Sequence, residues 1–178
     1  MRIISGKFRG TVIPSPKQEI VKPTLDRVKE NIFNILQFRI AGARCLDLFC
    51  GSGALGIECI SRGAKEVAFV DNNKANVEAL KKFLGKLNVQ NYNALTCDFY
   101  DALKKFSESG VKFDIIFLDP PFDSDLADIA ISKILKFDLL NDGGVIVHER
   151  SVESVSKFMQ KVADTRKYGT VAVDFLEK

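Results

Sequence analysis

From residue 44 onward the chain alternates short apolar runs with amphipathic segments, and this alternation most constrains its fold. Runs typical of buried strands lie at residues 44–49, 66–71, 92–97, 113–119 and 144–149. Segments with helical periodicity lie at residues 54–62, 73–87, 99–108, 125–136 and 152–161. Such alternation predicts a doubly wound, mostly parallel α/β sheet with helices on both faces. Residues 165–176 predict two further strands around Tyr168 and Gly169, so we expect seven strands with a terminal antiparallel element.

Residues 1–40 precede this alternation and predict a different structure. Short apolar stretches at residues 2–4 and 11–13 flank the sequence SGKFRG, which favours a hairpin with a basic, aromatic tip. An amphipathic helix is expected after the prolines, with its apolar face formed by Leu25, Val28, Ile32, Ile35 and Leu36. We therefore expect one domain over residues 1–178, with a hairpin and helix in residues 1–40 and a Rossmann-like core in residues 41–178.

Positive charge is concentrated at the N-terminus. The chain has 26 Lys and Arg against 23 Asp and Glu, a net charge of +3, but residues 1–44 hold nine basic and three acidic residues. A cationic segment on a slightly acidic body predicts an arm that contacts nucleic-acid phosphates. From charge alone, a solvated basic hairpin without a partner is an equally good explanation. The residues that we expect to contact phosphates are Arg2, Lys7, Arg9, Lys22 and Arg27.

The fourth predicted strand ends in the sequence Asp119-Pro120-Pro121-Phe122. Two consecutive prolines fix the backbone and remove two donors, so the loop is stiff. Asp119 and the carbonyl of Pro120 are then placed to accept the two hydrogens of an exocyclic amine, and Phe122 to cover the face of the base. A simple strand-ending turn explains the motif alone equally well. We assign these four residues to the catalytic site.

The first predicted strand leads into a glycine-rich loop, Cys50 to Gly56. The glycines have the G-x-G-x-x-G spacing of dinucleotide-binding loops, which alone is a weak signal. Asp47 before the loop favours a cationic ligand over a pyrophosphate, and S-adenosylmethionine carries both a sulfonium and an amino group. Asp71, at the end of the second strand, is placed to bind a ribose diol. Asp98 is placed to accept a hydrogen bond from the adenine amine, and the less favoured alternative for it is a helix N-cap before Phe99.

These strand ends together predict an S-adenosylmethionine site. Four acidic residues at four strand ends are hard to explain by folding alone, because ligands in such sheets bind beyond the carboxyl ends of the strands. The residues that we expect to contact the cofactor are Asp47, Phe49, Gly51, Gly53, Asp71, Asn72, Asp98 and Phe99.

Several segments make the chain resemble the RsmD family of bacterial small-subunit rRNA guanine-N2 methyltransferases. They are RIISGKFRG at residues 2–10, PTLDRVKENIFNIL at 23–36, LDLFCGSGALG at 46–56, SRGA at 61–64 and DPPF at 119–122. The similarity is weakest after about residue 150. Two positions depart from the family pattern: Lys22 stands where arginine is usual, which loses the guanidinium fork, and Asp71 stands where glutamate is expected.

The resemblance implies a Rossmann-like class I methyltransferase that modifies the N2 amine of a guanine in 16S rRNA, within the small ribosomal subunit or an assembly intermediate. An adenine-N6 methyltransferase on RNA or DNA would use the same Asp-Pro-Pro-Phe chemistry. An NAD-linked dehydrogenase would use the glycine loop but leave Asp47 and Asp119 without roles. A non-catalytic RNA-binding module is the remaining alternative, and the intact acidic residues argue against it.

The sequence also disfavours several classes of protein. No zinc-ligand spacing or P-loop ending is present, so we expect no metal. The single histidine, His148, is not accompanied by a nucleophile-elbow serine. No apolar run approaches the roughly 20 residues that span a bilayer, and the N-terminus lacks the apolar region of a secretory signal. Because no C-x-x-C pair is present, we expect the four cysteines to be reduced thiols in a cytoplasmic protein. We also expect no membrane partner.

Overall fold

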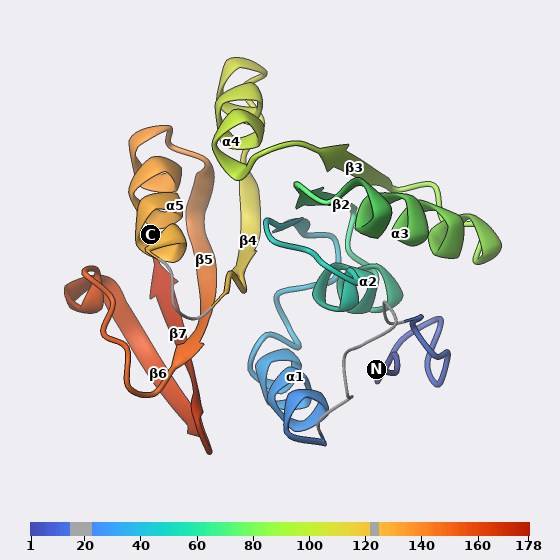
Figure 1. The fold of residues 1–178 in the computed structure, drawn as a ribbon, viewed down its shortest axis with the longest axis horizontal. Helices are drawn as coiled ribbons and strands as arrows, with labels where there is room; N and C mark the ends of the chain where they lie inside the picture. The colour runs from blue at the N-terminus through green and yellow to red at the C-terminus, as the bar shows by residue number, and fades with distance from the viewer. Residues whose placement is uncertain (15–22, 122–124) are drawn as a thin grey trace.

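The computed structural model describes residues 1–14, 23–121 and 125–178. Its strands are β1 (Arg44–Asp47), β2 (Glu66–Asp71), β3 (Tyr92–Thr96), β4 (Phe113–Leu118), β5 (Leu140–Ser151), β6 (Val162–Tyr168) and β7 (Val171–Glu177). They form one sheet in the order β3-β2-β1-β4-β5-β7-β6 (Figure 1). The first five strands are parallel, and β7 runs antiparallel to both β5 and β6. The expected seven-stranded, mostly parallel sheet with a terminal antiparallel element is confirmed.

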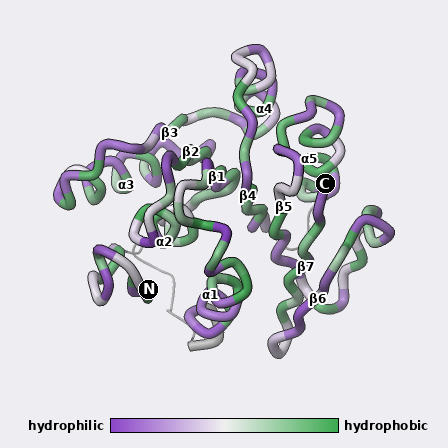
Figure 2. The backbone as a smooth tube through the Cα atoms, turned by 180° about the vertical axis from the view of Figure 1, so that it is seen from behind, coloured by the Kyte–Doolittle hydropathy of each residue, from purple (hydrophilic) through white to green (hydrophobic). Residues whose placement is uncertain are grey.

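Helices cover both faces of this sheet. They are α1 (Pro23–Ile35), α2 (Ala54–Ser61), α3 (Lys74–Lys86), α4 (Phe99–Glu108) and α5 (Leu126–Lys136). One buried cluster joins α1, α2 and α3 to one face, and a second joins α4 and α5 to the other. Hydrophobic and hydrophilic residues alternate along the helices, as expected when one side of each helix packs on the sheet (Figure 2).

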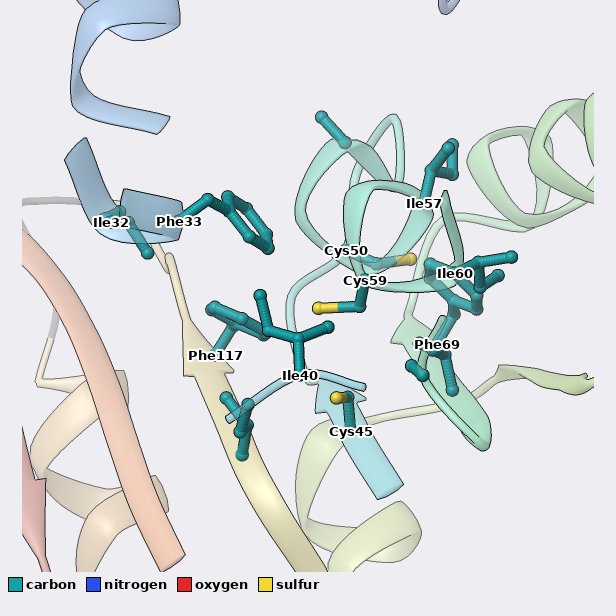
Figure 3. Close-up of a cluster of buried hydrophobic side chains, with 14 of the residues drawn as sticks. Ile32, Phe33, Ile40, Cys45, Cys50, Ile57, Cys59, Ile60, Phe69 and Phe117 are labelled. Atoms are coloured by element: carbon teal, nitrogen blue, oxygen red, sulfur yellow. The ribbon is translucent and has the colours of Figure 1, made fainter. Parts of the chain in front are cut away.

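The N-terminal helix is anchored in the core by aromatic packing. Phe33 of α1 is fully buried, and its ring centroid lies 5.9 Å from that of Phe117 on β4. Figure 3 shows both rings beside the buried thiol of Cys59, which comes from α2. The helix expected in residues 1–40 therefore packs directly on the sheet that carries the strand ends.

The predicted N-terminal hairpin is present with minimal pairing. Arg2 and Val12 form a single antiparallel bridge, flanked by hydrogen bonds from the Ile3 N–H to the Thr11 carbonyl and from the Gly10 N–H to the Ile3 carbonyl. The tip of the hairpin also bonds to the end of α2. The Lys7 N–H donates to the Ser61 carbonyl at 2.7 Å, and the Phe8 N–H donates to Ser61 Oγ at 3.0 Å. These bonds fix the hairpin against α2.

The helix expected over residues 152–161 is wrong. The structure has turns there, with only a short 3₁₀ turn at Met159–Lys161, and β5 is longer than predicted. Side chains hold the backbone in this segment: Arg150 Nη1 donates to the carbonyls of Ser151 and Ser154 at 3.1 and 2.6 Å. Asp128 accepts from the Lys157 N–H. Backbone groups bonded in this way are not available for a helix.

None of the helices in the described part of the chain is both long and apolar enough to cross a membrane.

Candidate active site

Acidic side chains meet at the carboxyl edge of the sheet. Asp47, Asp71 and Asp119 follow or end the neighbouring strands β1, β2 and β4. The pKa of Asp47 is raised to about 7, mainly by burial and also by the nearby charges of Asp119 and Asp71, while the hydrogen bond from the Gly56 N–H lowers it. The three carboxylates are therefore close enough to interact, as the sequence predicted from their positions.

Asp47 is buried and binds the backbone of the first turn of α2. Its side chain is only 3% exposed, and its Oδ2 accepts a hydrogen bond from the Gly56 N–H at 3.0 Å. One carboxylate oxygen is thus used to hold the helix that follows the glycine loop. A contact between Asp47 and the amino end of a cofactor stays a prediction.

The three glycines of the loop serve different purposes. Gly51 has a φ of +50°, and a Cβ placed there would meet no atom within 4 Å, so the loop borders open space at this position. A Cβ at Gly53 would lie 2.6 Å from Leu80 Cδ1, and one at Gly56 would lie 2.2 Å from the Phe69 ring. Gly53 and Gly56 therefore allow close packing of α2, whereas the Cβ side of Gly51 is open to a ligand.

A cavity of about 260 Å³ lies beside this loop. It is lined by Ile13 and Pro14 from the N-terminal hairpin, by Gly51 and Ser52, and by residues of α3. The end of the hairpin is thus a neighbour of the predicted cofactor site.

Asp71 connects two loops of the predicted cofactor site. Its Oδ2 accepts from the Gly51 N–H at 2.8 Å, and its Oδ1 accepts from the Asn73 N–H at 2.7 Å. Asn72, which stands between Asp71 and Asn73 in the chain, is exposed. Asp71 therefore shapes the glycine loop as well as offering a carboxylate at the edge of the sheet.

Asp98 is the N-cap of α4, since its exposed side chain accepts from the Tyr100 N–H at 2.8 Å. The alternative considered from the sequence for this residue is therefore what the structure shows, and an adenine contact stays a prediction. Phe99 packs against Phe49, with ring centroids 5.4 Å apart. These two half-buried rings offer an apolar surface next to Asp98.

The Asp-Pro-Pro loop borders a second cavity. Asp119 is exposed and Pro120 is buried, whereas Phe122 lies outside the described residues. The cavity has a volume of about 310 Å³ and is lined by the following residues: Pro120, Pro121, Asp125, Ala127, Asp128, His148, Glu149, Arg150, Ser154, Val155 and Ser156. The loop is therefore positioned as the wall of a hollow at the edge of the sheet.

Sequence reasoning did not identify Glu149, which lies on β5 in this cavity. Its side chain is 8% exposed, and burial, together with the charge of Asp119, raises its pKa to about 8. The signal was available, because Glu149 lies near the end of the fifth strand just as the other acidic residues lie at the ends of theirs. Neighbouring Arg150 is bound by Asp174, with Nε 2.6 Å from Oδ2.

Most of the predicted phosphate contacts are exposed. Arg2, Lys7, Arg9 and Arg27 lie on the surface, and Lys22 is outside the described residues. Lys29, which also contributes to the N-terminal charge, is only 3% exposed. Its Nζ pairs with Glu58 at 3.2 Å and donates to the Arg2 carbonyl at 2.7 Å, so it fixes the hairpin and is not part of the surface.

Comparison with known proteins identifies the family. The family described as "Conserved hypothetical protein 95" matches residues 1–177. The chain belongs to this family. It is 40% identical over 151 residues to "Ribosomal RNA small subunit methyltransferase D" of Haemophilus influenzae, a match that covers 84% of this chain and 78% of that protein. The resemblance to the RsmD family is confirmed.

Solved structures agree with this assignment. A proposed methyltransferase of Escherichia coli, yhhF, has a TM-score of 0.88 and 32% identity, covering 99% of this chain and 98% of that one. A 16S rRNA N2 methyltransferase of Thermus thermophilus, RsmC, solved with AdoMet and guanosine, has a TM-score of 0.72 and 27% identity. That similarity covers 91% of this chain and 44% of RsmC. The fold is the Rossmann-like methyltransferase fold.

Proposed function

We propose that this protein transfers a methyl group from S-adenosylmethionine to the N2 amine of a guanine in small-subunit rRNA. The observation that carries the proposal is the placement of Asp119 and the Pro120 carbonyl at one edge of the sheet, next to the acidic strand ends Asp47 and Asp71. The family and its rRNA methyltransferase members support the substrate class.

The acidic edge fits S-adenosylmethionine better than a dinucleotide. Asp47, Asp71 and Asp119 interact electrostatically, so they favour a ligand with positive charge beyond the strand ends. A pyrophosphate would be repelled by the same three groups, which disfavours an NAD-linked dehydrogenase. We assign Asp71 to the ribose hydroxyls, Asp47 and the Gly51–Gly53 backbone to the methionine end, and the surface of Phe49, Asp98 and Phe99 to the adenine.

The chemistry requires accurate positioning of a weak nucleophile. S-adenosylmethionine, when bound, supplies a methyl group on a sulfonium; the guanine N2 lone pair takes this methyl while the electron pair of the broken C–S bond stays on sulfur. Asp119 and the Pro120 carbonyl accept hydrogen bonds from the two N–H groups of the amine and direct its lone pair at the sulfonium methyl. The surplus proton then leaves the nitrogen for water. In-line positioning is the main contribution of these residues.

The target base must leave its stack to reach this edge. We assign Phe122 as a stacking surface for that base, from the sequence alone. The partner that we propose is rRNA within a small ribosomal subunit or its assembly intermediate, which places the protein in the cytoplasm.

The test is the nucleoside content of small-subunit rRNA, measured by mass spectrometry in a strain that lacks the gene. Loss of one N2-methylguanosine, restored by the wild-type gene, is the expected result. Loss of an N6-methyladenosine instead would establish the adenine alternative, and an unchanged nucleoside profile would overturn the proposal.

The exposed cations of the N-terminal arm should set the salt dependence of RNA binding. We expect that exchanging Lys7 and Arg9 for glutamine weakens binding and flattens the plot of log affinity against log salt by about one unit per lost phosphate contact, because fewer counterions are released. The measurement is a salt titration of binding to small-subunit rRNA.

Lys157→Gln is the control for the arm variants, because Lys157 is an exposed cation outside the arm. It should leave the slope unchanged, and S-adenosylmethionine affinity should be the same in all variants. If the arm variants keep the wild-type slope, the arm is a solvated surface without a role in RNA binding.

A further inference from the structure

The cavity beside the Asp-Pro-Pro loop contains a carboxyl group that the proposed transfer does not use. Glu149 lines this cavity, and its side chain is 8% exposed. The parallel register of β4 and β5 pairs Phe117 with Val147 and Leu118 with His148. Asp119 directly follows β4, and Glu149 is the next residue of β5, so the two residues continue neighbouring strands, which are spaced roughly 4.8 Å apart.

The cation next to Glu149 in the sequence, Arg150, is bound to other groups. The Arg150 guanidinium makes two hydrogen bonds to Asp174, with Nε–Oδ2 and Nη2–Oδ1 distances of 2.6 and 3.2 Å, and its Nη1 donates to the carbonyls of Ser151 and Ser154. Across the described residues, no hydrogen bond or ion pair to the Glu149 carboxyl group is found. Burial of a carboxyl group without such partners is costly, and a ligand that donates a hydrogen bond to it would offset this cost.

Guanine and adenine differ at the atom next to the reacting amine. In guanine the ring nitrogen N1 beside the N2 amine carries a hydrogen, whereas in adenine the N1 beside the N6 amine carries a lone pair. Above about pH 8, where the Glu149 carboxyl group is ionised, it accepts a hydrogen bond from the guanine N1–H and repels the adenine lone pair. With the amine held by Asp119 and the Pro120 carbonyl, a carboxyl group on the neighbouring strand is suitably placed for N1.

We propose that Glu149 accepts the N1–H of the target guanine and thereby selects guanine over adenine. This inference rests on the proposed function, because it assumes that the N2 amine is held at Asp119. It adds a specificity-determining residue that touches the Watson–Crick edge of the base, and it requires that the guanine is unpaired when it binds. Leaving Glu149 without its partner in a complex with adenine is the cost that rejects that base.

The experiment compares guanine with 2-aminopurine, which keeps the N2 amine but has no hydrogen on N1. Wild-type protein first identifies the methylated position in small-subunit rRNA. RNAs with guanine or 2-aminopurine at that position are then compared by single-turnover methylation at roughly pH 9, above the Glu149 pKa of about 8. We expect wild-type protein to prefer guanine about 10- to 100-fold, the value of one hydrogen bond to a charged group. In Glu149→Gln the preference should fall about tenfold, because the amide can also donate to an unprotonated N1.

Glu153→Gln is the matched control, because Glu153 is an exposed glutamate on the same segment, outside the cavity lining. It should keep the wild-type preference. A purely structural role for Glu149 would slow both substrates together and leave their ratio unchanged, so an unchanged ratio in Glu149→Gln overturns the inference. Its S-adenosylmethionine affinity, compared with the wild type, reports whether the variant is folded.

A second measurement needs no variant. RNA with 1-methylguanine at the same position replaces the N1 hydrogen with a methyl group, and wild-type protein should methylate its N2 amine at least 100-fold more slowly than that of guanine. Equal rates would overturn the role of Glu149 whatever the variants do. If wild-type protein forms no N2-methylguanine in any RNA, the proposed function itself fails, and the two failures are therefore distinguishable.

Discussion

Asp119→Ala should slow single-turnover methyl transfer on small-subunit rRNA on the order of 100-fold at saturating S-adenosylmethionine. The variant removes an acceptor that orients the amine, and misplacement of a reacting group by about 1 Å has a cost of this size. Pro120 and Pro121 keep the loop stiff, so the Pro120 carbonyl should remain in place and account for the residual rate. Cofactor affinity should change much less than the rate, because Asp119 contacts the base and not the methyl donor.

Asp119→Asn separates orientation from charge. The amide oxygen still accepts a hydrogen from the amine, so activity should survive in part if Asp119 only orients the base. Activity should fall to the level of Asp119→Ala if a full negative charge is required. Asp101→Asn, at an exposed aspartate in the first turn of α4, is the control and should keep the wild-type rate. A wild-type rate in Asp119→Ala would show that the loop is only a strand-ending turn.

Local signals were sufficient for most of the architecture. The predicted bounds of β2 and α4 match the structure because each element is set off by clear features: β2 is a continuous apolar run that ends at Asp71, and α4 begins at the Asp98 cap. The expected helix over residues 152–161 failed because a non-local interaction decides that segment. Asp128 on α5 and the Arg150 guanidinium bind its backbone, and neither contact can be seen in local periodicity.

The candidate site divides in the same way. Positions at strand ends follow from topology, so the grouping of Asp47, Asp71 and Asp119 was predictable. The direction of each side chain was not: the sequence offered both a cap and an adenine contact for Asp98, and it could not show that Gly53 leaves room for the Leu80 side chain. Glu149 was missed because only His148 was considered as a functional residue on the predicted strand that became β5. Its importance depends on its depth in the cavity, which a sequence does not report.

Asp47→Asn should stabilise the protein in the absence of cofactor, and increasingly so as the pH rises. The pKa of Asp47 is about 7 in the folded state, above its value of about 3.9 in an unfolded chain. A group whose folded pKa is raised contributes stability that is lost as the pH rises, here between about pH 4 and pH 7. Above pH 7 the folded protein holds a buried, charged carboxylate. Asparagine cannot ionise, and its amide oxygen can still accept from the Gly56 N–H.

The expected gain in the free energy of unfolding is about 2–4 kcal/mol at pH 8 and close to zero at pH 4, from the roughly 1.4 kcal/mol that each pKa unit represents. Urea denaturation of both proteins at pH 4, 6 and 8 measures it, with Asp101→Asn as a control that should show no such trend. A constant difference across this range would contradict the burial of a charge at Asp47.

The same substitution should weaken S-adenosylmethionine binding, because it removes a negative charge from the edge that we assign to a cationic ligand. A site that is destabilising without its ligand is the expected cost of keeping a buried carboxylate for binding.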